Sequence, residues 1–491
     1  MGKKDSKIKN KEVKDNKGIT ANKDEFSEWY SQVVQKAELG DLRYNVKGFL
    51  VFQPWSVLCM EKMYKYFEKA LQSRGHNPYF FPTLIPEENF NKEAGHVEGF
   101  SPEVFWVTHG GNTKFTERLA MRPSSETAFY QMFNLWVRSY KDLPFKTYQR
   151  ANVFRYETKA TRPFLRSREF HWIETHCCFA TFEDAMKQVE EDMEVTNDIL
   201  HDIFGLPFLF FERPQWDKFP GAERTFAADV LNPDGRVVQQ PSTHVIKQEF
   251  VKAFDIKYVD KDGKEKYVWT TCYGPAMSRI FASVIIVHGD DKGLRFPWEI
   301  APRHVVIVPI GDDKSLIKKA QELKKVIGEI GEVIIDDSDK SIGEKFNEWE
   351  MKGIPVRIDL GNRDLKEKKL TVFRRDLNKK EVINEKDLIK YLEKVKKESL
   401  KNLMKQADGL FNDRIKNVKN VNEMKKAILD GNIVRCGFCS IDASGEKCAA
   451  IVEKDVGAKV RGSNLVKEKA VGKCVVCNKK SKNVVYIARD Y

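Results

Sequence analysis

Charged and aromatic side chains that could bind a polyanion gather in one short stretch of the sequence. It contains Arg155 and Glu157 and, a few residues further on, Arg166, Arg168 and Phe170. Guanidinium groups match phosphate oxygens with two parallel hydrogen bonds and do not lose their charge. The stretch therefore suits a polyanion such as a nucleoside triphosphate, although a solvated basic hairpin would show the same residue types.

Two strands joined by a loop must position these side chains. Residues 151–154, Ala-Asn-Val-Phe, form an apolar approach that predicts a strand. Residues 158–163, Thr-Lys-Ala-Thr-Arg-Pro, predict a turn that breaks this strand. Residues 170–179 predict a second strand. An antiparallel pair with a charged loop would aim the guanidinium groups at a common point.

This hairpin resembles motif 2 of the class II aminoacyl-tRNA synthetases, whose pattern is Phe-Arg-x-Glu, a loop, and then Arg-x-x-x-Phe. Two other segments match the family in the same order. Residues 57–71 carry apolar side chains at helical spacing and lead to the strand-like residues 78–82, which together resemble motif 1. Residues 273–287, which include Arg279, resemble motif 3. In this family motif 1 builds a dimer interface.

One branch of the family is indicated by three shorter signatures. Residues 121–127, Met-Arg-Pro-Ser-Ser-Glu-Thr, resemble the Arg-Pro-Thr-Ser-Glu loop of prolyl-tRNA synthetases. Residues 163–170 are close to the motif 2 loop of those enzymes, and residues 287–294 match a further signature. The sequence resembles the archaeal and eukaryotic-like type without an inserted editing domain, since the interval from His176 to Tyr273 leaves no room for one.

The resemblance implies a proline–tRNA ligase. Such an enzyme activates L-proline with ATP and Mg²⁺ to prolyl-adenylate, and then transfers proline to the 3′ end of tRNA(Pro). It also implies a cytoplasmic homodimer without a membrane segment. A threonyl, seryl or glycyl synthetase shares the three motifs, but the loop at 121–127 argues against it. A synthetase-like regulator without activity is the alternative that is not an enzyme, and the retention of Arg155, Glu157, Phe170 and Arg279 argues against it.

The resemblance assigns roles at the ATP end of the site. Arg155 would bridge the amino-acid carboxylate and the α-phosphate, and Arg279 would neutralise the γ-phosphate end, so these two are the candidate catalytic residues. Phe170 would stack on adenine. Glu157 would accept a hydrogen bond from the adenine amino group, or simply pair with an arginine. The candidate ATP-binding residues are Arg155, Glu157, Arg166, Ser167, Phe170, Gln239, Ser242 and Arg279.

A second set of residues would bind proline. By the same resemblance Glu126 would hold the secondary ammonium of proline, assisted by the Ser124 hydroxyl. Trp172 and His176 alternate along one predicted strand and therefore share a face. The candidate proline-binding residues are Ser124, Glu126, Arg155, Trp172, His176 and His244, in which the histidines either touch the ligand or orient other groups.

Two departures from the family pattern affect this pocket. Ser124 stands where the family has threonine, which keeps the hydroxyl and removes a methyl group. Gln240 and Pro241 stand where the family has two glycines, which permit a close backbone approach. The loop before Ser242 and His244 must follow another path, and the roles of these two residues depend on it.

The composition agrees with a cytoplasmic protein that binds a polyanion. The 84 basic and 72 acidic residues give a formal charge of +12. No apolar run approaches the roughly 18 residues that a membrane span needs, and the Lys-rich N-terminus lacks an apolar signal core.

We expect an α+β protein with three folded parts. The catalytic domain would hold the antiparallel sheet of the class II synthetases, and alternating strands and helices after it indicate a compact α/β domain. Glu350 and Arg357 of that domain match positions that read the anticodon in the family, although each could be a surface charge. The expected parts are a disordered Lys-rich tail at 1–24, the catalytic domain at 25–302, the anticodon-binding domain at 303–402 and a small α+β zinc-binding domain at 403–491.

Five of the nine cysteines lie in the last 56 residues. Two Cys-x-x-Cys pairs in a reducing compartment are typical of tetrahedral zinc. Spacing alone selects Cys436, Cys439, Cys474 and Cys477. The resemblance instead implies Cys436, Cys448, Cys474 and Cys477, with Cys439 as a spare or a substitute, and this second set is the one we expect for a structural Zn²⁺.

Overall fold

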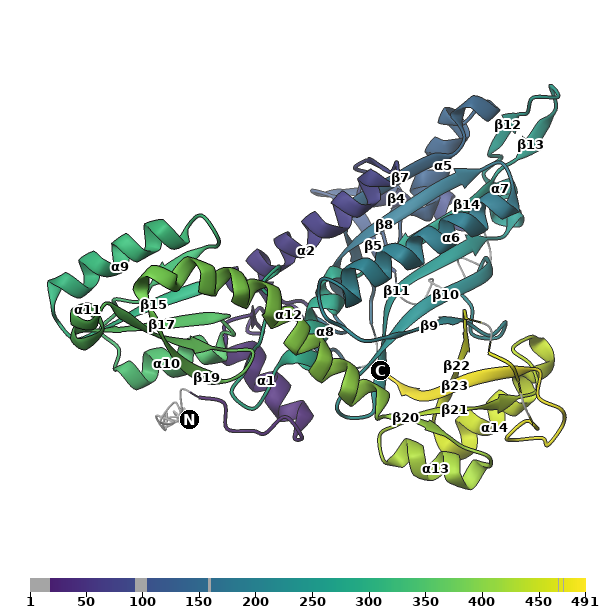
Figure 1. Cartoon of the computed structure of the whole chain (residues 1–491). Coiled ribbons are helices and arrows are strands. Elements are labelled where there is room, and N and C mark those ends of the chain that lie inside the picture. The colour runs from purple at the N-terminus through teal and green to yellow at the C-terminus, as the bar shows by residue number, and fades with distance from the viewer. Residues whose placement is uncertain (1–17, 93–103, 158–159, 467, 471) are drawn as a thin grey trace, which may run out of the picture.

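The computed structural model describes residues 18–92, 104–157, 160–466, 468–470 and 472–491. Most of the predicted tail at 1–24, and Thr158 and Lys159 of the predicted turn, lie outside these residues. The chain forms an N-terminal domain around a large sheet, a middle α/β domain at one end, and a C-terminal domain, yellow in Figure 1, packed against the sheet.

The large sheet has eleven strands and extends from the N-terminal domain into the C-terminal domain. Its neighbouring strands, in order, are β20-β21-β23-β22-β9-β10-β11-β14-β8-β7-β3. The strands are β20 (Ile415–Asn417), β21 (Ile433–Phe438), β23 (Asn483–Asp490), β22 (Lys459–Asn464), β9 (Leu209–Glu212), β10 (Ala222–Leu231), β11 (Arg236–Ile246), β14 (Trp269–Gly274), β8 (Glu169–Phe179), β7 (Phe145–Phe154) and β3 (Asn77–Pro78).

Helices and three small sheets surround the N-terminal part of this sheet. The helices are α1 (Phe26–Lys36), α2 (Pro54–Ser73), α3 (Glu87–Asn91), α5 (Glu126–Trp136), η2 (Tyr140–Asp142), α6 (Phe182–Thr196), η3 (Asn197–His201), α7 (Gln248–Ala253) and α8 (Met277–His288). The small sheets are β1 (Gly40–Asp41) with β2 (Val51–Phe52), β4 (Leu84–Pro86) with β6 (Thr113–Met121) and β5 (Phe105–Gly110), and β12 (Lys257–Val259) with β13 (Glu265–Tyr267).

The predicted charged hairpin is confirmed. Strands β7 and β8 pair antiparallel, from Phe145 opposite Cys178 to Phe154 opposite Glu169. This pairing fixes the positions of both ends of the loop between them. Helix α8, with Arg279 in its first turn, is apolar on nearly all sides and is buried against α1 and α2. The described residues between β8 and β14 belong to the large sheet and its covering elements, and they form no separate domain.

The middle domain has the predicted alternation of strands and helices. Strands β16, β15 and β17 are parallel, and β18 and β19 add an antiparallel hairpin that the sequence did not indicate. Ser341 caps the start of α10 and forms a capping box with Glu344. The elements are β15 (Val305–Ile310), α9 (Lys314–Ile327), β16 (Val333–Ile335), α10 (Ile342–Met351), β17 (Val356–Gly361), α11 (Asn362–Glu367), β18 (Lys369–Arg374), β19 (Lys379–Asn384) and η4 (Glu385–Asp387).

A single long helix, α12 (Leu388–Asn412), connects the middle domain to the C-terminal domain (Figure 1). The expected boundary between residues 402 and 403 therefore falls inside a continuous helix. The C-terminal domain adds α13 (Val421–Leu429), η5 (Ala443–Gly445) and α14 (Glu446–Val456) to its four strands. Among the described residues, no helix is both long and apolar enough to cross a membrane.

Two glycines bring the N-terminal and middle domains into close backbone contact. Gly293 has φ +125°, and a Cβ atom there would lie 2.6 Å from the carbonyl oxygen of Met351. Gly353 has φ +70°, and a Cβ atom there would lie 2.6 Å from the Cβ of Leu294. The two domains meet closely at these positions because neither residue has a side chain.

We predict that Gly293→Ala destabilises the protein by roughly 1–3 kcal/mol, because it adds both backbone strain and a clash with Met351. Thermal and denaturant unfolding measure the loss. Gly343→Ala is the matched control, since Gly343 lies in α10 with nothing near its missing Cβ, and it should be neutral or slightly stabilising. Equal stability of the Gly293→Ala variant and the wild type would contradict the contact.

Candidate active site and metal centre

Adjoining cavities open on the face of the large sheet, at the loop between β7 and β8. One, of about 360 Å³, contains Ser124 and Glu126 in its lining, and another, of about 350 Å³, is also lined by Tyr491 of the C-terminal domain. Both cavities share Arg155, Gln239 and Arg279. All the residues predicted for ATP and proline line one of these cavities or a smaller one beside them, namely Ser124, Glu126, Arg155, Glu157, Arg166, Ser167, Phe170, Trp172, His176, Gln239, Ser242, His244 and Arg279.

Three guanidinium groups converge where these cavities meet. Arg155 donates from Nε to the carbonyl oxygen of Pro123 at 3.1 Å, and Arg166 forms an ion pair with Glu157 at 2.9 Å. Arg279 donates from Nη1 to the carbonyl oxygen of Gln239 at 3.2 Å. Burial, and after it the like charges of Arg155 and Arg166, lower the pKa of Arg279 to about 10. Arg279 is therefore still charged at neutral pH, and the three guanidinium groups favour an anion between them.

The prediction that the loop arginines share one target is right for two of them and wrong for the third. Arg168 lines none of the three cavities. Its guanidinium lies 4.2 Å from the centre of the Tyr156 ring, and it donates to the carbonyl oxygen of Lys47 at 3.2 Å. The contacts with Tyr156 and Lys47 hold Arg168 away from the cavities.

Gln240 and Pro241, which stand where the family has two glycines, form a bulge in β11. Asp229 pairs with Gln239 and Ala227 pairs with Ser242, so β11 has one residue more than β10 between these pairs. A proline is tolerated at a bulge because no ladder hydrogen bond needs its missing N–H. Gln240 donates to the Ser283 hydroxyl of α8 at 2.7 Å. The altered segment keeps Gln239 and Ser242 on the cavity wall and fastens β11 to α8.

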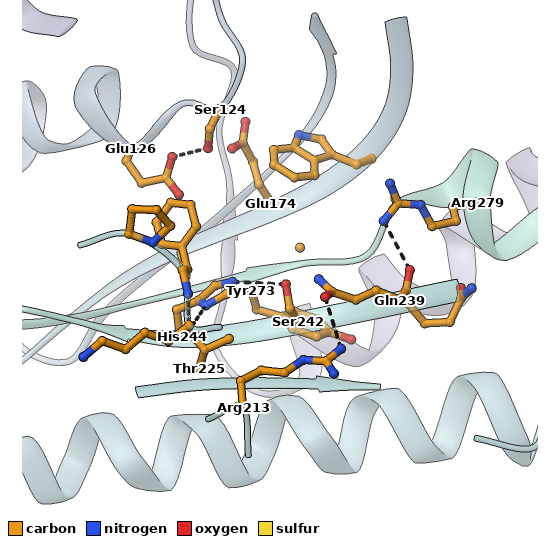
Figure 2. Close-up of a pocket in the computed structure, with 18 of the residues that line it drawn as sticks. Ser124, Glu126, Glu174, Arg213, Thr225, Gln239, Ser242, His244, Tyr273 and Arg279 are labelled. Carbon is orange, nitrogen blue, oxygen red and sulfur yellow. Dashed lines mark hydrogen bonds between the residues drawn. The ribbon is translucent and has the colours of Figure 1, made fainter. Parts of the chain in front are cut away.

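The end of the cavity away from Arg279 is lined by carboxylates (Figure 2). Ser124 donates a short hydrogen bond to Glu126. Glu174, which is buried, accepts hydrogen bonds from the Ser125 hydroxyl at 2.5 Å and from the Gln149 amide at 2.7 Å, and lies 3.2 Å from Nε2 of His176. Glu174 therefore fixes the loop that carries Glu126, and His176 has a partner on its own strand.

The opposite wall of the same cavity comes from β10 and β11. His244 bonds through Nδ1 to the Thr225 hydroxyl at 3.0 Å and through Nε2 to the Ser242 hydroxyl at 3.1 Å. Burial lowers the pKa of His244 to about 4, so the ring is neutral at physiological pH. A neutral imidazole between two hydroxyls orients them, and it adds no positive charge that would repel an ammonium ligand.

Sequence reasoning missed several residues of the cavity wall. Arg213, Asp217 and Lys218 line the larger cavity, and Arg461 and Asp490 of the C-terminal domain line its neighbour. These residues have no periodic pattern or short-range motif in the sequence. They reach the site only through the pairing of distant strands, which a single sequence does not reveal.

Glu350 and Arg357 of the middle domain lie together, as the anticodon prediction requires. Arg357 donates to Glu350 at 2.9 Å and to Asp359 at 2.7 Å. Its guanidinium lies 3.7 Å from the centre of the Phe346 ring, and the residue is only 1% exposed. Glu350 is partly exposed and also pairs with Lys292. Their roles in reading an anticodon stay a prediction.

Four cysteines of the C-terminal domain form a metal-ligand geometry, and they differ from the expected set. The sulfur atoms of Cys439, Cys448, Cys474 and Cys477 all lie within 4.8 Å of one another. Cys436 belongs instead to the apolar core beneath β21, where strand alternation turns its side chain inward. Cys439 follows the end of this strand and takes the place that we had given to Cys436. Four thiolates at these separations fit a tetrahedral ion with Zn–S bonds of about 2.3 Å.

Family models match three regions of the chain. They describe a tRNA synthetase class II core domain (G, H, P, S and T) at residues 105–288, an anticodon binding domain at 304–395 and a prolyl-tRNA synthetase C-terminal domain at 421–491.

Curated relatives and solved structures match nearly the whole chain. A proline–tRNA ligase of Thermofilum pendens is 48% identical over 483 residues, which cover 96% of this chain and 99% of the relative. One of Methanopyrus kandleri is 40% identical, with coverage of 95% and 96%. The Giardia lamblia prolyl-tRNA synthetase in complex with prolyl-adenylate superposes with a TM-score of 0.93 at 36% identity, covering 96% of this chain and 100% of that one.

We predict that Cys439→Ser releases zinc, whereas Cys436→Ser retains about one zinc per chain. Elemental analysis of protein purified without chelator measures both, and wild-type protein sets the reference. The reason is geometric, since only Cys439 has its sulfur among the other three. Loss of zinc from the Cys436→Ser variant, with retention in Cys439→Ser, would restore the set inferred from the sequence.

Proposed function

The chain belongs to the prolyl-tRNA synthetase family, and from that membership we propose that it is a proline–tRNA ligase. It activates L-proline with ATP and transfers proline to the 3′ end of tRNA(Pro), without an internal editing domain. The observation that carries this proposal is the juxtaposition of two unlike sites in adjoining cavities. A cluster of guanidinium groups around Arg155 and Arg279 lies next to a small pocket with the carboxylate of Glu126.

Activation requires positioning and neutralisation of charge rather than acid–base chemistry, because a carboxylate is already a nucleophile. An oxygen of the proline carboxylate attacks the α-phosphorus, the bond to the β-phosphate oxygen breaks, and pyrophosphate leaves. Arg155 lies between the two cavities and screens the repulsion between carboxylate and phosphate. Arg279 neutralises the departing phosphates. Phe170 stacks on adenine, and Glu157 holds Arg166 over the nucleotide.

Fixed dipoles and charges select the amino acid. Glu126, with Ser124 as its hydrogen-bond donor, accepts the two N–H groups of the proline ammonium. Trp172 and His176 wall the ring on one side, and neutral His244 walls it on the other. A secondary ammonium is favoured at this end of the cavity because the carboxylate of Glu126 lies there and the His244 ring is neutral.

The proposed function includes two ions, Mg²⁺ bound with ATP and Zn²⁺ in the C-terminal domain. Oxygen atoms of Glu157, Asp217 and Gln239 line the cavities beside the arginines and suit Mg²⁺, which prefers oxygen ligands and would neutralise phosphate charge when bound with ATP. Zn²⁺ held by the four clustered cysteines is structural, because four thiolates leave no open coordination position.

The middle domain binds the anticodon of tRNA(Pro) in this proposal. Glu350 is the exposed member of the Glu350–Arg357 pair and accepts N–H donors of guanine, while buried Arg357 holds the carboxylate in place. The proposed location is the cytoplasm, where charged tRNA is used.

We also propose a homodimer through α2 and the segments beside it. Phe80, in the segment that resembles motif 1, is 85% exposed, and Tyr44, Val46, Val51 and Leu84, which flank the motif 1 segments in the sequence, are also exposed apolar residues. Exposed apolar side chains of this size are typical of an interface. Sedimentation equilibrium should give twice the chain mass of 56.9 kDa. A monomer at micromolar concentration would contradict the dimer.

Removing the central charge should abolish activation. We expect Arg155→Ala to lower proline-dependent formation of labelled prolyl-tRNA by roughly 10²–10³-fold or more, because a charged donor to the transition state is lost.

Glu126→Gln should instead raise the KM for proline and leave the KM for ATP nearly unchanged, because Glu126 lines only the amino-acid end of the cavity.

Arg168→Gln is the matched control for Arg155→Ala, since it removes a guanidinium from the same loop that lines none of the cavities. It should retain most of the activity. Equal losses in the Arg155 and Arg168 variants would show that the effect comes from the loop as a whole and not from the site.

A further inference from the structure

A buried cluster of three charged residues joins the C-terminal domain to the wall of the ATP cavity. Asp229 of β10 is fully buried and lies between two arginines. Arg461 of β22 donates to it from Nε at 2.7 Å and from Nη2 at 3.1 Å. Arg213 donates to it from Nη2 at 2.7 Å and from Nη1 at 3.1 Å. Burial alone would raise the pKa of Asp229, but the two arginines outweigh it and hold this pKa at about 2.

Irregularities of the backbone occur at the residues that make this contact. The β22–β23 ladder is irregular between Val460 and Gly462, which places Arg461 in a bulge. Bulges redirect a side chain out of the regular alternation. Gly462, at φ +133°, allows β22 to lie against β9, because a Cβ there would come 2.1 Å from the Glu212 carbonyl oxygen. Asp229 pairs directly with Gln239, next to the bulge in β11.

The contacts continue from this cluster to the nucleotide-binding arginine. Arg213 donates from Nη2 to the Gln239 side-chain oxygen at 3.2 Å, and Arg279 donates to the Gln239 backbone oxygen at 3.2 Å. Figure 2 shows Arg213 and Arg279 both connected to Gln239. A chain of direct contacts therefore runs from Arg461 through Asp229, Arg213 and Gln239 to Arg279.

The cost of burial argues that this cluster does more than join two domains. A buried ion pair is weak evidence for stability, because desolvation offsets most of the attraction. Arg461 also pairs with Asp490 at 3.7 Å, so acidic groups balance the charge of the two arginines. Arg213 and Arg461 themselves line the two cavities. Their placement fixes Gln239, the residue that Arg279 contacts.

We propose that Arg461 is a positioning residue of the nucleotide site, and that it sets Gln239 and Arg279 through Asp229 and Arg213. The C-terminal domain is then a working part of ATP binding. This inference deepens the proposed function and rests on its assignment of the cavity to ATP.

ATP binding measured by isothermal titration calorimetry on the full-length, zinc-loaded protein tests this role without relying on activity. Arg461→Gln should weaken ATP binding roughly tenfold or more, because Gln239 and Arg279 would lose their alignment with the phosphates. Arg461→Lys keeps the charge and loses the two-pronged contact, so it should fold and show a smaller, severalfold loss. In ATP–pyrophosphate exchange the KM for ATP should rise while that for proline stays within twofold.

Arg435→Gln is the matched control. Arg435 pairs with Glu468 inside the same domain and does not line the cavity beside Arg461. Its replacement should leave ATP binding unchanged. In a Gln239→Ala background, Arg461→Gln should have little further effect on ATP affinity, because the chain of contacts from Arg461 to Arg279 passes through Gln239.

ATP affinity within twofold of wild type in both Arg461 variants would overturn the inference. So would equal rises in the KM values for ATP and proline, or additive effects with Gln239→Ala. Failure of the proposed function would differ, because wild-type protein would then bind ATP and give no proline-dependent exchange.

Discussion

Repulsion among guanidinium groups in one enclosed site is the interaction on which the rest of the structure depends. Arg155, Arg166 and Arg279 would separate if their backbones were free to move. Backbone carbonyl oxygens, such as that of Gln239, and the carboxylate of Glu157 hold them at fixed positions. Burial, and after it the neighbouring arginines, lower the pKa of Arg279, so the charged form of this group is disfavoured without a neutralising anion. A polyphosphate relieves the repulsion when it binds, so rigid supports convert repulsion into affinity.

The continuous eleven-stranded sheet supplies this rigidity. Antiparallel pairing of β7 with β8 fixes Arg155 relative to Trp172 and Glu174, and the neighbouring strands β14, β11 and β10 extend the same frame. The C-terminal domain adds β22 to the edge at β9, and β23 pairs with the start of β11. A domain that is separate in sequence thereby becomes part of the wall of the site.

Local patterns in the sequence predicted the hairpin and the alternation of strands and helices in the middle domain. These features depend on neighbouring residues, which a single sequence displays. The bulge at Gln240 and Pro241, the burial of Arg357 and the exchange of Cys436 for Cys439 depend on strand registers and on which side of a strand faces the core. Arg213 and Arg461 are 248 positions apart, and they share Asp229 only because β22 joins β9. No local pattern contains that information.

In the proposed function, fixed charges in two adjoining cavities select proline and activate it with ATP. The most direct test is ATP–pyrophosphate exchange by the wild-type protein with each of the twenty amino acids, at equal concentrations and with Mg²⁺ present. We expect strong exchange with proline and only weak exchange with small analogues that fit the same pocket. Exchange that does not depend on proline, or a preference for threonine, serine or glycine, would contradict it.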